Sequence, residues 1–120
     1  MNAGKKKIAS PAAAAPSVAE MVENIVGCKW SLRVLALVRE GVSRPGAMEH
    51  AVDGLTAKVL NERLRKLSRY GIVDKTVYPE SPPRVEYRLT EFGQRFSALL
   101  DEIEQLEAAL RGSGNDPFSG

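Results

Sequence analysis

The chain has 120 residues, of which 43% are hydrophobic, and a formal net charge of +2, as expected of one domain with a modest core. Its single cysteine excludes an internal disulfide, and one cysteine with one histidine excludes a four-ligand zinc site built by one chain. No apolar run approaches the about 18 residues of a membrane-spanning helix, so we expect a cytoplasmic protein with no metal, no cofactor and no membrane partner.

The first 16 residues are rich in lysine, alanine and proline, a composition that cannot bury enough apolar surface to become ordered. A disordered basic tail over residues 1–16 is therefore favoured over a basic arm that reaches into a minor groove. Ser17 and Glu20 then form a capping-box pattern, which predicts a first helix that ends at Gly27.

Two more helices are expected next. Apolar residues recur at helical spacing from Lys29 or Trp30 to Glu40, and Gly41 provides the stop. Residues 42–44 are consistent with a short strand. A proline at residue 45 suits the first turn of a third helix, which we expect to cover residues 45–51.

The segment from Leu55 to Tyr70 predicts an amphipathic helix. Thr56 stands at the N-cap position and Gly71 just past the end. The apolar stripe, at positions i, i+4 and i+7, consists of Leu60, Leu64 and Leu67. The opposite face carries side-chain types that contact phosphates and base edges, namely Lys58, Asn61, Glu62, Arg65 and Arg69.

A short turn containing glycine, residues 52–54, joins this helix to the one before it. Such a pair of helices predicts a helix-turn-helix whose second helix reads DNA; the alternative is a solvated charged face. Residues 54–90 hold eight basic and four acidic residues, a net +4, whereas residues 91–111 hold two and five, a net −3. Positive charge therefore gathers around the reading helix, as in nucleic-acid-binding proteins.

After this helix, the spacing of apolar residues changes from the helical period to the period of two that is typical of strands. Residues 72–78 are rich in β-branched and aromatic residues, and residues 85–89 alternate apolar and charged, which predicts two strands. The proline-rich residues 79–84 between them suit an exposed hairpin loop. A hairpin directly after a reading helix is a wing that can lie along the sugar-phosphate backbone.

Thr90 caps the last predicted helix, and residues 112–120 form a second frayed tail. Apolar residues recur in this helix at spacings of 4, 3, 4, 3 and 4, namely Phe92, Phe96, Leu99, Ile103, Leu106 and Leu110. Part of this seam can close the core of its own domain, but a seam this long and narrow more often packs against another helix, and the simplest partner is a second copy of the chain. We therefore expect a mostly helical α+β fold: a winged helix-turn-helix with a C-terminal dimerisation helix, over residues 17–111.

The chain resembles the HxlR-type regulators, which are winged-helix transcription factors of prokaryotes related to the MarR group. The resemblance is carried by residues 27–30, 55–67, 71–73 and 77–87, together with Leu89, Thr90 and Gly93. It implies a homodimer, DNA binding through the reading helix and the wing, and control of nearby genes in response to small reactive or toxic compounds. A small-molecule effector of unknown identity belongs to this expectation, as does a nucleoid-associated location.

Three departures from the family pattern stand out. Ser17 occupies the position where many members carry a redox-sensing cysteine, so the resemblance does not bring a thiol switch to that position. Cys28 replaces the usual glycine; beside Lys29 it is a candidate redox site, although a small buried hydrophobe is the favoured interpretation. Residues 44–48 replace a run that resembles Phe-Ser-Glu-Leu in many members.

The expected partner is a pseudo-palindromic operator in double-stranded DNA. Base contacts are predicted for Thr56, Ala57, Lys58, Asn61 and Glu62. Phosphate contacts are predicted for Arg44, Arg65, Arg69, Lys75, Arg84 and Arg88. The dimer interface is predicted to contain Val18, Met21, Phe96, Leu99, Ile103, Leu106 and Leu110.

Two other function classes compete with this interpretation. The winged helix could instead be a protein-interaction module that binds an acidic partner. An enzyme would have to use His50, the only histidine, which no catalytic motif surrounds, so no enzymatic activity is expected.

Overall fold

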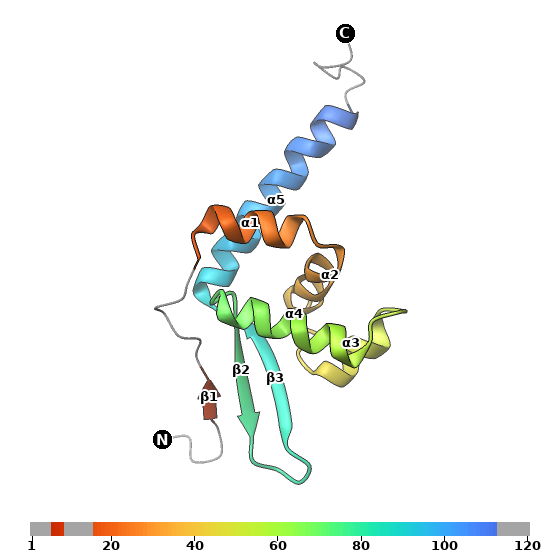
Figure 1. Cartoon of the computed structure of the whole chain (residues 1–120), viewed down its shortest axis with the longest axis vertical. Coiled ribbons are helices and arrows are strands. Elements are labelled where there is room, and N and C mark those ends of the chain that lie inside the picture. The colour runs from red at the N-terminus through yellow and green to blue at the C-terminus, as the bar shows by residue number, and fades with distance from the viewer. Residues whose placement is uncertain (1–5, 9–15, 113–120) are drawn as a thin grey trace.

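The computed structural model describes residues 6–8 and 16–112, and within these it contains five helices and one sheet. The helices are α1 (Val18–Val26), α2 (Lys29–Arg39), α3 (Pro45–Ala51), α4 (Ala57–Arg69) and α5 (Glu91–Gly112). The strands are β1 (Lys6–Ile8), β2 (Val73–Tyr78) and β3 (Arg84–Leu89). Figure 1 shows the helical body above the hairpin and α5 running away from both. The predicted winged helix-turn-helix with a C-terminal helix is confirmed.

Each helix begins and ends where the local sequence indicates. The Ser17 hydroxyl accepts a hydrogen bond from the backbone N–H of Glu20 at 3.1 Å, which caps α1. Gly71 has a φ of +75°, and the N–H of Ile72 bonds to the carbonyl of Leu67 at 3.0 Å. This pattern is a Schellman motif, in which a glycine adopts the left-handed conformation that other residues avoid.

The core lies where α2 meets α1, α4 and the inner face of the hairpin. Side chains with no exposed surface come from α1, α2, α4 and the residue just before β2, namely Ile25, Val34, Leu60, Leu64, Leu67 and Ile72. Because the three leucines of α4 are all buried, the predicted apolar stripe is confirmed. This burial fixes the rotation of α4, and its opposite face therefore lies on the surface.

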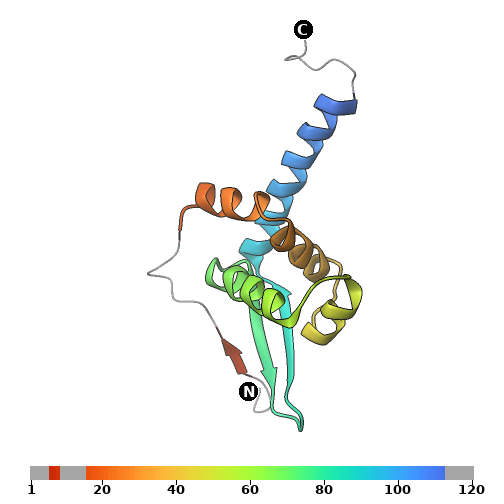
Figure 2. The same cartoon turned by 45° about the vertical axis from the view of Figure 1, so that its right-hand side comes forward.

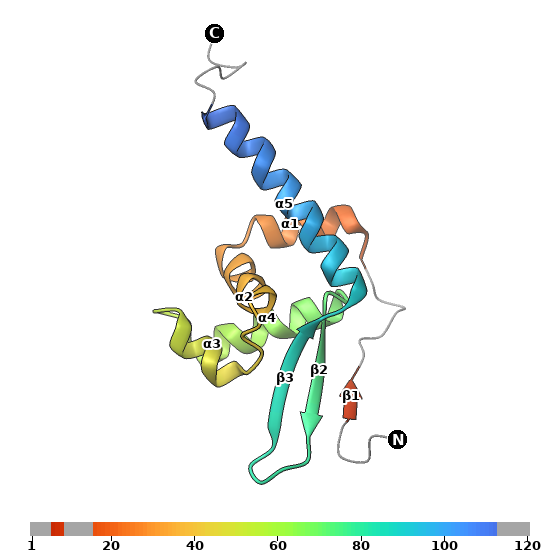
Figure 3. The ribbon, with the colours of Figure 1, turned by 180° about the vertical axis from the view of Figure 1, so that it is seen from behind.

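The hairpin pairs in antiparallel register from Val73 opposite Leu89 to Tyr78 opposite Arg84. A third strand, β1, pairs antiparallel with the other edge of β2, and Figure 3 shows it on the side of β2 away from β3. The disordered tail over residues 1–16 stays a prediction; within it, residues 6–8 pair with the open edge of β2, which offers backbone partners to a segment that cannot bury a core of its own. The rest of that prediction, and the predicted C-terminal tail beyond residue 112, lie outside the described residues.

Two contacts hold the hairpin against the helices. The N–H of Tyr87 in β3 donates to the carbonyl of Ser43 at 2.8 Å. Residues 42–44 are thus extended beside β3 but do not form the short strand that the sequence suggested. At the other end, Thr90 donates its hydroxyl to the carbonyl of Gly71 at 2.6 Å and accepts from the N–H of Gly93 at 2.8 Å.

The C-terminal part of α5 has few neighbours in its own chain. Residues 104–112 are all exposed, and Figure 2 shows this part of the helix extending beyond the rest of the domain. Its first half is anchored: Phe96 and Leu100 are buried in the core. Within the described residues, no helix is long and apolar enough to cross a membrane.

Candidate nucleic-acid interface

The outer face of α4 is exposed. Thr56 caps the N-terminus of α4, because its hydroxyl accepts a hydrogen bond from the N–H of Val59 at 3.2 Å. The predicted reading residues are all exposed: Thr56, Ala57, Lys58, Asn61, Glu62, Arg65 and Arg69. Among the described residues, no side-chain hydrogen bond or ion pair engages Lys58, Asn61 or Arg65. These groups are therefore available to an external ligand.

The C-terminal end of α4 is tied to α1. The amide of Asn24 donates to the hydroxyl of Tyr70 at 3.0 Å, and the guanidinium of Arg69 lies 5.8 Å from the centre of the Tyr70 ring. Lys66 and Arg69 stand in the last turn, where positive charge interacts favourably with the helix dipole. Arg69 thus remains exposed while its neighbour fixes the helix end.

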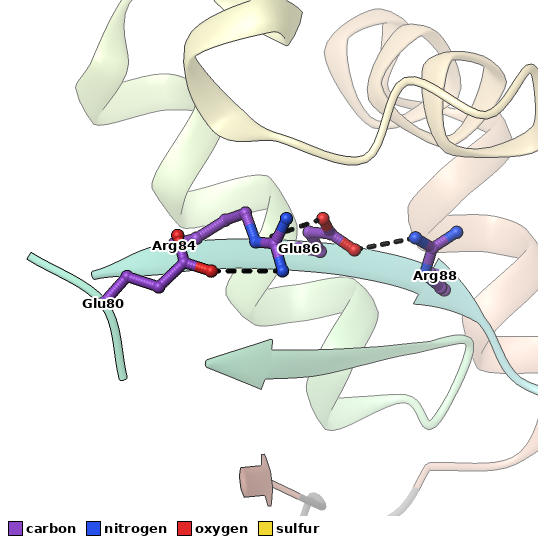
Figure 4. A network of polar contacts seen from close by, with 4 residues as sticks. All are labelled: Glu80, Arg84, Glu86 and Arg88. Atoms are coloured by element: carbon purple, nitrogen blue, oxygen red, sulfur yellow. Dashed lines mark hydrogen bonds and ion pairs between the residues drawn. The ribbon is translucent and has the colours of Figure 1, made fainter. Parts of the chain in front are cut away.

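The wing carries an ion-pair network that links its predicted phosphate contacts to acids of the same hairpin (Figure 4). Arg84 lies 3.3 Å from Glu80 and 3.7 Å from Glu86. Arg88 lies 2.7 Å from the other oxygen of Glu86, whose side chain is only 10% exposed. The guanidinium of Arg84 also stacks 4.0 Å from the ring centre of Tyr78, so both arginines already have anionic partners.

The sequence analysis missed this network, although a signal for it exists. Arg84, Glu86 and Arg88 alternate along one strand, so their side chains share one face of the sheet. Tyr78 lies directly opposite Arg84 in the hairpin register. Charges of alternating sign at positions i, i+2 and i+4 of a strand could have indicated that this face of the wing forms internal ion pairs.

Arg44 and the wing loop lie on either side of one depression. Arg44 precedes α3 as its N-cap residue and is exposed. A surface depression of about 640 Å³ is lined by residues 44–47 on one side and by residues 80–85 on the other. The structure thus brings Arg44 close to the hairpin, whereas Lys75 is partly buried in the middle of β2.

Tyr87 of β3 belongs to the same buried core as the apolar face of the reading helix. Burial raises the pKa of the Tyr87 hydroxyl above its ordinary value, and the positive charge of Arg65 opposes this shift in part. Arg65 of α4 thus acts electrostatically on Tyr87 of β3.

The predicted dimer residues fall into three groups by exposure. Val18, Leu99, Leu106 and Leu110 are exposed, and Leu106 is the most exposed at 61%. Ile103 is partly buried. Met21 and Phe96 are only 4% and 2% exposed and belong to the core of their own chain, so neither offers surface to a second copy.

A groove of about 460 Å³ separates α2 from the outer half of α5. Apolar side chains line its floor, among them Val26, Leu35, Leu100 and Ile103. Charged residues stand at its rim, where Arg39 pairs with Asp101 at 2.7 Å. The groove continues the exposed apolar surface of α5.

Cys28 lies at the N-terminus of α2 and is partly buried. Burial raises the pKa of its thiol, but the nearby polar groups of Ser31 and the positive charge of Arg63 outweigh burial, so the pKa lies below its ordinary value. Within the described residues, no group of three or more His, Cys, Asp or Glu side chains is placed to hold a metal ion.

Comparisons with known proteins agree with this geometry. One similar protein is an HTH-type transcriptional regulator of Synechocystis sp., 40% identical over 85 residues, which cover 71% of this chain and 63% of the relative. Another, from Methanothermobacter thermautotrophicus, is 37% identical over 84 residues, 70% of this chain and 64% of the relative. The chain thus spans slightly less than two thirds of these two proteins.

A solved structure has the same fold. It is a protein described as a transcriptional regulator of the MarR family, from Enterococcus faecalis V583, with a TM-score of 0.72 and 29% identity, covering 80% of this chain and 87% of the other. The HxlR-like helix-turn-helix family matches residues 25–113. These residues include the reading helix, the wing and all of α5. The chain belongs to the HxlR-like helix-turn-helix family.

Proposed function

We propose that this protein is a sequence-specific DNA-binding transcriptional regulator that acts as a homodimer. One observation carries the proposal: the apolar face of α4 is fully buried, while its opposite face is exposed, rich in cations and without ion pairs to the rest of the described chain. A helix held in this way can enter a major groove without losing contacts to its own domain. The relatives named as HTH-type transcriptional regulators support the same function.

Within α4 we assign base reading to the N-terminal half. Asn61 carries the amide that can bond bidentately to adenine, a contact that discriminates between bases by about 1–3 kcal/mol. Lys58 and Glu62 lie on the same exposed face, with Thr56 and Ala57 at its start. Arg65 and Arg69 follow farther along the helix, and we assign them to phosphates together with Arg44.

Pairing of two copies is assigned to the exposed apolar surface of α1 and α5. Leu99, Leu106 and Leu110 are exposed apolar residues of α5 that its own chain leaves uncovered, and such a seam is typical of helix pairing. Two-fold symmetry would present the two reading helices to half-sites separated by roughly one helical turn of DNA or a multiple of it. The operator is then pseudo-palindromic.

Fluorescence anisotropy on the protein's own promoter region, at several salt concentrations, tests the proposal. Each neutralised phosphate contributes about −0.9 to the slope of log K against log salt, so several contacts give a steep line. A flat line overturns DNA binding, as does capture of an acidic protein partner by a protein that shifts no DNA even at low salt.

Two substitutions test the assigned roles. Asn61→Ala is expected to relax sequence preference at one position in each half-site, whereas Arg65→Ala weakens binding to all sequences and lowers the salt slope by about one. Gln94→Ala, which removes an exposed amide from α5, is the matched control and should leave both quantities unchanged. Equal, non-selective losses from Asn61→Ala and Arg65→Ala would contradict the assignment.

A further inference from the structure

The turn between α4 and β2 is bonded to both of the elements assigned to pairing. Tyr70 is the C-cap residue of α4, Gly71 adopts a φ of +75°, and Ile72 precedes β2. The hydroxyl of Thr90, which caps α5, donates to the carbonyl of Gly71 at 2.6 Å. On the other side, the amide of Asn24 in α1 donates to the hydroxyl of Tyr70 at 3.0 Å. The end of the reading helix is therefore held by α1 and by α5.

The bond between Asn24 and Tyr70 differs in kind from the other contacts of α1. Met21 and Ile25 of α1 enter the apolar core, and such packing has no preferred direction. In the part of the chain that the structure describes, no other side-chain hydrogen bond or ion pair joins α1 to another element. A hydrogen bond weakens steeply as its angle changes, so this contact fixes how α1 is turned relative to the end of α4.

The ring of Tyr70 also lies beside the DNA-facing side of α4. Tyr70 is only 6% exposed, and the guanidinium of Arg69 lies 5.8 Å from the centre of its ring. One buried side chain thus contacts α1 through its hydroxyl and an assigned phosphate-binding arginine through its ring. A change in the angle between α1 and α4 would be felt at both contacts.

We propose that Tyr70 is a positioning residue: its bond to Asn24 fixes the reading helix relative to the paired molecule and makes the dimer selective for the spacing of its half-sites. This inference rests on the proposed DNA binding and pairing, and it assigns spacing selectivity to one contact. One added base pair turns a half-site by roughly 34° and moves it by about 3.4 Å along the duplex. A reading helix that is fixed to α1 cannot follow this displacement, whereas a helix that can turn against α1 can.

The alternative is that the bond only stabilises the fold. Tyr70→Phe removes the hydroxyl and leaves the ring beside Arg69. Asn24→Ala removes the other partner at an exposed position of α1, and it provides a second test should Tyr70→Phe fold poorly. If the effect arises from this one bond, the double variant should behave like either single variant.

Two control variants separate the bond from its surroundings. Glu23→Ala removes an exposed side chain next to Asn24 on the same helix. Val34→Ala removes buried volume from α2, where Val34 has no exposed surface, so it lowers the melting temperature without altering the bond. A merely structural role of Tyr70 predicts that Val34→Ala and Tyr70→Phe change DNA binding in the same way.

The assay uses the full chain and fluorescein-labelled duplexes that the parent protein has selected from a random-sequence library. Each selected duplex is remade with one base pair added or removed between its half-sites. The parent should bind the altered duplexes at least about tenfold more weakly, because DNA or protein has to absorb the rotation. Tyr70→Phe, Asn24→Ala and the double variant should lose less than about threefold, while Glu23→Ala and Val34→Ala should keep the parent's penalty.

Each contrary result has a distinct meaning. A parent-like penalty in Tyr70→Phe or Asn24→Ala, with DNA binding intact, overturns the role of the bond and leaves the proposed function in place. An equally reduced penalty in Val34→Ala attributes the effect to lost stability and likewise overturns the positioning role. Equal binding of the parent to every spacing shows that there is no selectivity to explain. Failure of the parent to select or bind any duplex overturns the proposed function as well.

Discussion

Gly93 occupies a position that tolerates no side chain, and Gly93→Ala tests how α5 is attached to the rest of the domain. A Cβ atom at this position would lie 2.0 Å from the carbonyl oxygen of Ile72 and 2.9 Å from its carbonyl carbon. Both atoms belong to the backbone, so the first turn of α5 has to move away from the junction between α4 and β2. That carbonyl also accepts the N–H of Thr90 at 3.0 Å, and the movement would break this bond.

The cost follows from these two effects. Overpacking of a tight contact costs about 1–3 kcal/mol, and loss of one backbone hydrogen bond costs about 1 kcal/mol. We therefore expect Gly93→Ala to lower the free energy of unfolding by about 2–4 kcal/mol. For a domain of this size, the melting temperature should fall by at least about 10 °C.

Urea and thermal unfolding at one fixed protein concentration provide the measurement, since association alters apparent stability. Gly112→Ala is the matched control: no atom lies within 4 Å of its added Cβ, and the substitution should be neutral or should stabilise the helix by up to about 1 kcal/mol. If Gly93→Ala and Gly112→Ala have the same urea midpoint and the same melting temperature, the close approach of α5 to Ile72 is refuted.

Three further predictions follow from the wing and α5. Glu86→Gln removes the carboxylate shared by two wing arginines and leaves the hairpin at +1, so arbitrary duplexes should bind more tightly and the salt slope should steepen by up to about 0.9 for each phosphate gained; an unchanged slope would contradict this. Leu106→Glu should convert the proposed dimer to monomers in analytical ultracentrifugation because it places a charge in the apolar seam, whereas Gln105→Glu should remain dimeric; a dimeric Leu106→Glu would place the interface elsewhere. The raised pKa of Tyr87 means that folding favours the neutral form of its hydroxyl. The contribution of this group to the free energy of unfolding is therefore fully present below pH 10 and is lost as the pH rises through the folded-state pKa. Urea unfolding across this range should show a smaller loss for Tyr87→Phe than for the parent, and identical losses would show that Tyr87 does not titrate in this way.

Patterns within a short segment predicted most of the helical fold. The stripe of Leu60, Leu64 and Leu67 gave the correct inner face of α4, because residues three and four positions apart share one side of a helix. The Thr56 cap and the Gly71 stop fixed its ends, because both are local backbone requirements. The residues opposite this stripe were predicted to lie on the surface, and all of them are exposed.

Contacts between distant segments were harder to predict. The pairing of β1 with β2 leaves no periodic signal, since three residues are too few to show alternation. The sequence analysis placed both Phe96 and Leu99 of α5 in the dimer interface. In the structure, Phe96 is buried in its own chain and Leu99 is exposed. An apolar period shows which face of a helix is covered but does not identify the molecule that covers it.

The exposed end of α5 has a consequence for how the protein would respond to its own abundance. A helical segment of nine exposed residues, 104–112, is too short to be stable in water without support. Under the proposed pairing, this support comes only from a second molecule, so assembly and local folding occur together. A dilute protein would then lose both its partner and the order of this segment, and occupancy of a two-part operator would rise more steeply than the amount of protein in the cell.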